Sequence, residues 1–137
     1  MPLDADRCWE LLREADHAVL ATRHVVRGVD AVPVAFIVDG TRVVIPIDNV
    51  KAKSTTRLQR LANIATDARV VVLAEHYEDD WTQLWWVRAS GRAAELAVTE
   101  EWLHAFAAKY EPYRAEGAIA SVIAVEVASI TGWVAAK

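Results

Sequence analysis

An anion-binding pattern occupies residues 45–60 (IPIDNVKAKSTTRLQR), where a predicted strand passes through a short loop into a predicted helix. The loop and first helical turn supply two ammonium groups, a hydroxyl run and a guanidinium: Lys51, Lys53, Ser54, Thr55, Thr56 and Arg57. A helix N-terminus offers unpaired N–H groups and the positive end of the helix dipole, so the segment predicts a phosphate site. A solvated basic loop before an ordinary capped helix explains the spacing equally well, because no glycine-rich phosphate loop accompanies it.

A second candidate segment, residues 78–92 (EDDWTQLWWVRASGR), holds three of the six tryptophans. Strand alternation predicts Leu84, Trp86 and Arg88 on one face. Trp85 and Val87 then face the other way. Large aromatic residues on both faces indicate that the core covers one face and a ligand or second subunit the other. Core packing of all the tryptophans is the competing explanation.

Other reactive side chains form weaker patterns. His76 stands among acidic residues at positions 75–80, a composition more typical of a solvated turn than of a metal site. We therefore predict no metal. Cys8 is expected to be a core cysteine of the first helix, and no spacing indicates a catalytic nucleophile.

Composition limits the class of protein. The 137 residues (15.2 kDa) predict a single domain over residues 1–137, and 54% hydrophobic residues exclude a disordered chain. A net charge of −4 argues against nucleic-acid binding. No apolar run approaches the roughly 20 residues of a membrane helix, and the acidic N-terminus does not resemble a signal peptide. The expectation is a soluble cytoplasmic protein.

These two segments must be positioned by the rest of the fold, which is predicted to consist of strands paired in hairpins and a few helices. Hydrophobic periodicity predicts helices over residues 4–15, 54–65 and 99–110 and six strands over residues 17–23, 31–38, 41–47, 69–75, 83–94 and 121–135. We expect a two-residue turn at Asp39-Gly40, an edge strand or a strand end near Pro46, a bulge or turn at Gly91 and an interruption near Thr131-Gly132. This order predicts a mainly β (α+β) fold, a six-stranded antiparallel barrel with flanking helices.

The sequence resembles the split β-barrel flavin and deazaflavin oxidoreductases, relatives of pyridoxamine 5′-phosphate oxidase, most closely the actinobacterial F420-dependent subgroup. The resemblance covers nearly the whole chain, and residues 80–88 (DWTQLWWVR) are its most specific part. The other matching motifs are LAT (20–22), VPVAF (32–36), Asp48 with Lys51 and Lys53, TTRL (55–58), LANI (61–64), Lys109-Tyr110 with Tyr113, and TGW (131–133).

The resemblance implies an FMN-binding type of split barrel and a homodimer with two cofactor sites at the subunit interface. The resemblance implies that five residues lie against the isoalloxazine-like ring of the cofactor: Pro33, Val34, Ala35, Ile47 and Asp48. Those implied to hold the phosphate are Lys51, Lys53, Ser54 and Arg57, and Trp81 and Trp86 would wall the pocket from the other subunit. The chain departs from the family in its short hairpin, in Pro46 and in lacking an arginine-rich C-terminus, so pyridoxamine phosphate oxidation is not expected.

The function implied is an F420-dependent oxidoreductase, in which reduced deazaflavin passes a hydride to an electron-poor organic small molecule. The sequence identifies no catalytic residue, although Arg88 would stabilise negative charge if it faced the site. An FMN-binding oxidoreductase of the same fold is the nearest alternative. A non-catalytic F420- or flavin-binding protein and a dimeric structural domain with an empty site are the others.

Overall fold

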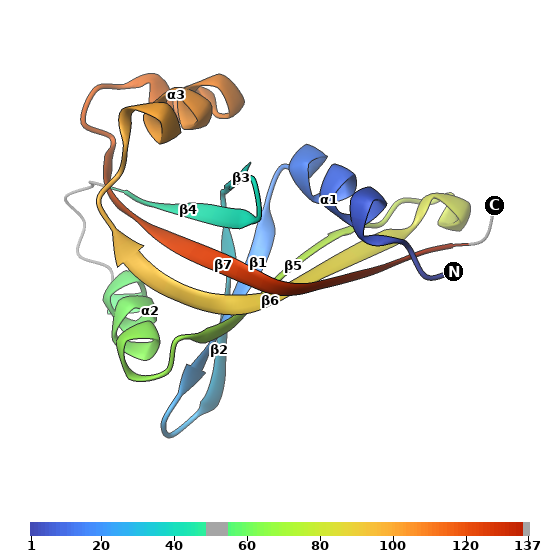
Figure 1. Cartoon of the computed structure of the whole chain (residues 1–137), viewed down its shortest axis with the longest axis horizontal. Helices are drawn as coiled ribbons and strands as arrows, with labels where there is room; N and C mark the ends of the chain where they lie inside the picture. Colours follow the sequence, from blue (N-terminus) through green and yellow to red (C-terminus); the bar gives the residue numbers. More distant parts are fainter. Residues whose placement is uncertain (49–54, 136–137) are drawn as a thin grey trace.

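The structure, a computed structural model, describes residues 1–48 and 55–135, with the backbone alone for residues 55–58 (Figure 1). Three helices are present in this part of the chain: α1 (Ala5–Glu14), α2 (Thr55–Thr66) and α3 (Glu100–Lys109). Short 3-10 helices η1 (Trp81–Gln83) and η2 (Glu111–Arg114) precede the last two strands. The strands are β1 (Ala18–His24), β2 (Gly28–Val34), β3 (Ile37–Asp39), β4 (Arg42–Asp48), β5 (Arg69–His76), β6 (Trp85–Leu96) and β7 (Ile119–Val134).

All seven strands form one antiparallel sheet in the order β2-β1-β5-β6-β7-β4-β3. The mainly β class is confirmed, but six strands in a closed barrel is wrong: there are seven, in an open hydrogen-bonded order. The extra strand arises because the predicted strand over residues 31–38 divides at Ala35 and Phe36, where the chain turns from β2 into β3. Figure 1 shows β6 and β7 as a long, curved pair that runs across the molecule.

Three local predictions need correction or refinement. The β3–β4 turn is centred on Gly40 and Thr41, one residue later than predicted, since Asp39 pairs with Arg42 and Gly40 has a φ of +61°. β4 does not end near Ile45. At Pro46, however, it pairs with β7 alone among the described strands, so a local edge there is confirmed.

The predicted interruption near Thr131-Gly132 is wrong, because β7 continues to Val134. Gly132 instead allows α1 to pack closely on the strand: a Cβ there would lie 2.8 Å from Cys8 Sγ. Cys8 is fully buried, as predicted, and burial raises the pKa of its thiol.

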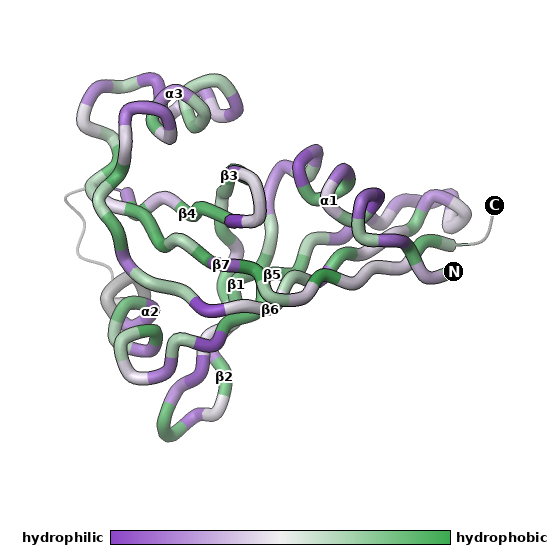
Figure 2. The backbone as a smooth tube through the Cα atoms, viewed as in Figure 1, coloured by the Kyte–Doolittle hydropathy of each residue, from purple (hydrophilic) through white to green (hydrophobic). Residues whose placement is uncertain are grey.

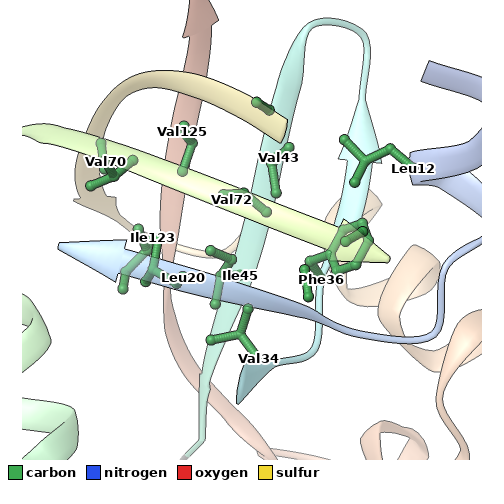
Figure 3. Close-up of a cluster of buried hydrophobic side chains, with 14 of the residues drawn as sticks. Leu12, Leu20, Val34, Phe36, Val43, Ile45, Val70, Val72, Ile123 and Val125 are labelled. Atoms are coloured by element: carbon green, nitrogen blue, oxygen red, sulfur yellow. The ribbon is translucent and has the colours of Figure 1, made fainter. Parts of the chain in front are cut away.

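The main core lies inside the curved sheet, under α1 and α2 (Figure 3). Residues from one face of the strands fill it, among them Leu20, Val34, Ile45, Val72 and Val125, together with Phe36 from the turn between β2 and β3. A smaller cluster forms where Trp102 and Phe106 of α3 pack on β4 and β7 residues. Figure 2 shows the matching hydrophobic segments along the central strands. No helix among the described residues is long and apolar enough to cross a membrane.

The register of β6 on β7 shifts between Ser90 and Gly91, because Ser90 pairs with Ser129 and Gly91 with Val127. The predicted irregularity therefore lies at this glycine, but the extra residue of the bulge is Ala128 on β7. Only a residue without a side chain fits, because a Cβ at position 91 would overlap the backbone carbonyl oxygen of Glu126 and lie 2.9 Å from the Cα of Val127. Close approach of β7 thus dictates glycine here.

Gly91→Ala is expected to lower the free energy of unfolding by about 2 kcal/mol or more, since backbone atoms must move to admit the methyl group. Urea unfolding followed by circular dichroism measures the change. Ser90→Ala, at the neighbouring half-buried position, is the matched control and should change the value by less than about 0.5 kcal/mol. Equal stability of the two variants would contradict the close approach.

Candidate functional site

A buried asparagine anchors α2, the helix that follows the predicted anion-binding loop. Asn63 is 3% exposed, and its Nδ2 donates to Thr22 Oγ1 and to Asp30 Oδ2, both at 2.9 Å. Gln59 Nε2 donates to Asn63 Oδ1 at 2.8 Å. These bonds tie the second half of α2 to the β1–β2 hairpin.

The other end of the same loop begins at Asp48, the last residue of β4. The hydroxyl of Tyr113, from η2, donates to Asp48 Oδ1 at 2.7 Å. Burial and this bond to a carboxylate raise the pKa of Tyr113, so it stays protonated and remains a donor. The strand before the predicted anion-binding loop is therefore fixed at its last residue, and the helix after the loop is fixed through Asn63.

The corner between β2 and β3 is the third structural part of the site. The Phe36 N–H donates to the Tyr110 hydroxyl at 3.0 Å, and Lys109 Nζ donates to the Phe36 carbonyl at 2.9 Å. The Tyr110 hydroxyl donates in turn to the Asp16 carbonyl at 2.7 Å. Burial lowers the pKa of Lys109 to about 8, although the negative charge of Asp16 opposes this shift.

The predicted ring-contact residues divide into two groups. Val34 and Ile47 point into the core, with 8% and 3% exposure, so they could meet a ligand only through their backbone. Pro33 is exposed, and Ala35 and Asp48 are half-buried. The ring interactions between Tyr110 and Tyr113 (5.8 Å between centroids) connect the Phe36 corner to Asp48.

The predicted phosphate ligands are not placed by the structure. Lys51, Lys53 and Ser54 lie outside the described residues. Arg57 lies in the first turn of α2, but its side chain is also outside the described part. Their role in anion binding stays a prediction.

The tryptophans lie on different surfaces. Trp86 is half-buried on the face of β6 opposite the core, with Arg88 Cζ 5.0 Å from its ring, whereas Trp85 packs on the core side. This confirms the predicted alternation, except that Leu84 precedes β6 and is buried. Trp81, in η1, is 68% exposed and meets Tyr77 edge-on.

One chain does not bring the two parts of the predicted site together. Asp48 pairs with Ile119 at the start of β7, and Trp86 pairs with Trp133 near its end. The part of β7 from Ile119 to Trp133 is about 45 Å long when measured along the curved strand. In Figure 1 the end of β4 and the β5–β6 connection accordingly lie at opposite ends of the molecule.

The outer face of the sheet joins these ends and is partly apolar. One row across β2, β1, β5 and β6 holds, in order, Pro33, Val19, Leu73 and Arg88. Beside it lies a hollow of about 470 Å³ with a floor of small and aliphatic residues and arginines at its rim. Its lining includes Ala21, Val71, Ser90, Ala128, Arg23, Arg69 and Arg92.

Ion pairs reduce the positive charge of this surface. Arg23 Nε lies 3.2 Å from Asp67, whose pKa is lowered by its hydrogen bonds from Arg69. Arg27 makes two bonds to Asp30 and lowers the pKa of that carboxyl, as does Asn63. Arg27 therefore forms a neutral pair with Asp30, whereas Arg23 and Arg69 share the single carboxylate of Asp67 and leave one positive charge in excess.

The acidic turn after β5 forms a single close pair, in which His76 Nε2 lies 2.6 Å from Glu78 Oε1. Residues 1–48 and 55–135 contain no group of three histidine, cysteine, aspartate or glutamate side chains that could hold a metal.

Sequence reasoning missed the roles of Asn63, Lys109, Tyr110 and Tyr113 in holding the site. A polar residue between the apolar Leu61, Ala62 and Ile64 was the available signal for Asn63. Nothing local marks Tyr113, because its partner is 65 residues away in the chain.

A family model described as pyridoxamine 5′-phosphate oxidase matches residues 4–134. Among solved structures, an FAD binding protein from Mycobacterium smegmatis is 20% identical, with a TM-score of 0.66 over 97% of this chain and 98% of that one. An FAD-binding protein from Mesorhizobium loti is 15% identical, with a TM-score of 0.73 over 96% and 93%. A flavocytochrome from Azotobacter vinelandii is 14% identical, with a TM-score of 0.72 over 99% and 70%. No curated protein sequence matches the chain.

Lys109 generates a prediction about pH. Its pKa of about 8 lies below the ordinary 10.5, so between these values the unfolded chain binds more protons than the folded chain. The free energy of unfolding should therefore gain a contribution that rises with pH from about 8 upward. Urea unfolding at about pH 7.5, 8.5 and 9.5, below most tyrosine titration, should give an unfolding free energy that rises more steeply, or falls less steeply, with pH in the wild type than in Lys109→Met. The comparison cancels the opposite contribution of the Cys8 thiol, whose raised pKa is common to both proteins. Identical pH slopes for the two proteins would contradict the lowered pKa.

Proposed function

Because the chain belongs to the pyridoxamine 5′-phosphate oxidase family, we propose that it is a cofactor-dependent oxidoreductase that works as a homodimer and uses F420. The observation that carries the proposal is the separation of the Asp48 end of β7 from its Trp86 end. If both ends contact one cofactor, a second chain must supply one of them. Homodimers with twofold symmetry make two such shared sites.

The outer sheet face supports dimer formation. Half-exposed apolar side chains cover it on adjacent strands, including Val19, Ala21, Val71, Leu73 and Trp86. A second copy that packed here would remove this apolar surface from water and bring its own tryptophans near the β2–β3 corner.

The residues present fit a planar cofactor with an anionic tail. Lysine, serine and arginine at a helix start are suitable donors for a phosphate, and the exposed Pro33 and half-buried Ala35 offer a surface without bulky side chains. When bound, reduced F420 supplies a hydride to an electron-poor C=C or C=N of a small organic substrate.

The chain's own residues would bind and orient. Lys51, Lys53, Ser54 and Arg57 would hold the phosphate, and the tryptophans of the partner would exclude water from the ring. Arg88, on the same face as Trp86, would place a positive charge near negative charge that develops on the substrate. No side chain need act as nucleophile.

A flavin is the second candidate cofactor. The similar solved structures from Mycobacterium smegmatis and Mesorhizobium loti are described as FAD-binding, and that from Azotobacter vinelandii as a flavocytochrome. These descriptions favour FMN or FAD, whereas the resemblance of residues 80–88 to the F420-dependent subgroup favours F420.

Titration of the purified protein with F420, FMN and FAD, followed by tryptophan fluorescence, tests the proposal. We expect saturable quenching, with the lowest Kd for F420, and hydride transfer from reduced F420 to quinone or nitro compounds. If FMN or FAD binds more tightly than F420, the cofactor is a flavin, the second candidate. If the protein binds none of the three compounds, the proposed function is overturned.

Lys53→Ala is expected to raise the cofactor Kd about 10- to 150-fold, since one charge-assisted phosphate contact contributes roughly 1.5–3 kcal/mol. Arg7→Ala is the control, because Arg7 is an exposed cation of α1 that pairs with Glu10. Its Kd should stay within about twofold of the wild type. Equal Kd values for Lys53→Ala and wild type would contradict phosphate binding by this loop.

A further inference from the structure

We propose that α3 and η2 position the cofactor site, with Tyr113 as the residue that orients Asp48 and with Lys109 and Tyr110 as the residues that fix the β2–β3 corner. The inference rests on the proposed function, in which the corner and the end of β4 line the ring. It assigns to this helical unit a role in binding that its place outside the sheet does not suggest.

The corner needs outside partners because Ala35 and Phe36 lie between two strands and take no part in the ladder pairing. Phe36 is fully buried, so its backbone polar groups are removed from water. Its N–H and C=O both find their partners on the last residues of α3, the Tyr110 hydroxyl and Lys109 Nζ. The Lys109 ammonium also lies 4.0 Å from the centroid of the Phe36 ring.

The end of β4 is held in a similar way. Asp48 still pairs with Ile119, but the register of β4 on β7 shifts between Ile47 and Asp48, so the ladder is irregular where β4 ends. The hydrogen bond from Tyr113 acts on the Asp48 carboxylate at this point, immediately before the predicted phosphate-binding residues. A bond to a charged acceptor is stronger than one between neutral groups.

Both contacts come from one rigid unit. The ring of Tyr113 packs edge-on against Tyr110 and against Phe106 of α3, each at 5.8 Å between centroids. Arg114 Nε donates to the Ala107 carbonyl at 3.1 Å, which ties η2 back to the helix. A shift of this unit would therefore move the corner and the end of β4 together.

The test compares Tyr113→Phe with Trp102→Phe. Each variant removes one aromatic hydrogen-bond donor to a carboxylate from the same helical unit, because Trp102 Nε1 donates to Asp39 Oδ2 at 2.8 Å. Asp39 lies at the β3–β4 turn, at the other end of β4 from Asp48. Melting temperature and Kd for F420 and FMN are measured for both.

We expect Tyr113→Phe to raise the Kd about five- to tenfold at temperatures well below its melting point. Trp102→Phe should melt at an equal or lower temperature and still bind within about twofold of the wild type. In an Asp48→Ala background, Tyr113→Phe should have less than about a twofold further effect, because it acts through Asp48.

The outcomes separate the two proposals. A wild type that binds a cofactor, with a Kd that Tyr113→Phe leaves unchanged, overturns the positioning role and leaves the proposed function intact. Equal losses of affinity in Tyr113→Phe and Trp102→Phe also overturn it, since they would reflect general destabilisation. A wild type that binds none of F420, FMN and FAD overturns both.

Discussion

Backbone pairing of β7 along its whole length is the constraint on which this structure and its function depend. β4 pairs with the first half of the strand and β6 with nearly all of it, so its two ends cannot approach each other. A hydrogen-bonded strand keeps its rise per residue even when it curves. The Asp48 end and the tryptophan end are therefore held apart within one chain, and a shared site requires two chains. In the proposed homodimer, the partly apolar outer face of the same sheet would be the surface on which the two chains pair.

Side chains that are distant in the sequence hold the elements on either side of the predicted phosphate-binding loop. Asn63 holds α2 against the β1–β2 hairpin, and Tyr113 holds the end of β4. Lys109 and Tyr110 satisfy the backbone of a buried corner that no strand can pair. Each of these bonds serves a polar group whose desolvation would otherwise cost free energy, so stability and site geometry have the same origin. Substitutions at these positions should therefore affect both the stability of the fold and the geometry of the site.

Much of this fold follows from local pattern, and the exceptions have tertiary causes. Period-two alternation predicts that Trp85 and Trp86 face opposite ways, and only the packing of the sheet shows that Trp86 faces outward. Gly91 marks an irregularity in the ladder whose need for glycine comes from Glu126. Residues 31–38 read as one strand because they form a continuous apolar run. They divide at Phe36 because Lys109 and Tyr110, more than 70 residues later in the chain, satisfy its backbone there. Pro46 is accommodated because β3 is too short to pair with β4 at this position. The sequence around Pro46 does not determine the length of β3. For the site, the sequence predicts the anion-binding chemistry, whereas the separation of Asp48 from Trp86 depends on β7 and emerges only in three dimensions.

Subunit complementation tests the shared site most directly. Lys53→Ala and Trp86→Leu each damage one of the two parts, so each homodimer should bind cofactor weakly. After the two proteins are unfolded together and refolded, half of the random dimers carry one intact site and one doubly damaged site. The account predicts recovery of about a quarter of the wild-type binding capacity at a cofactor concentration that saturates only intact sites. A mixture that binds no better than the separate variants would contradict a site built from two chains.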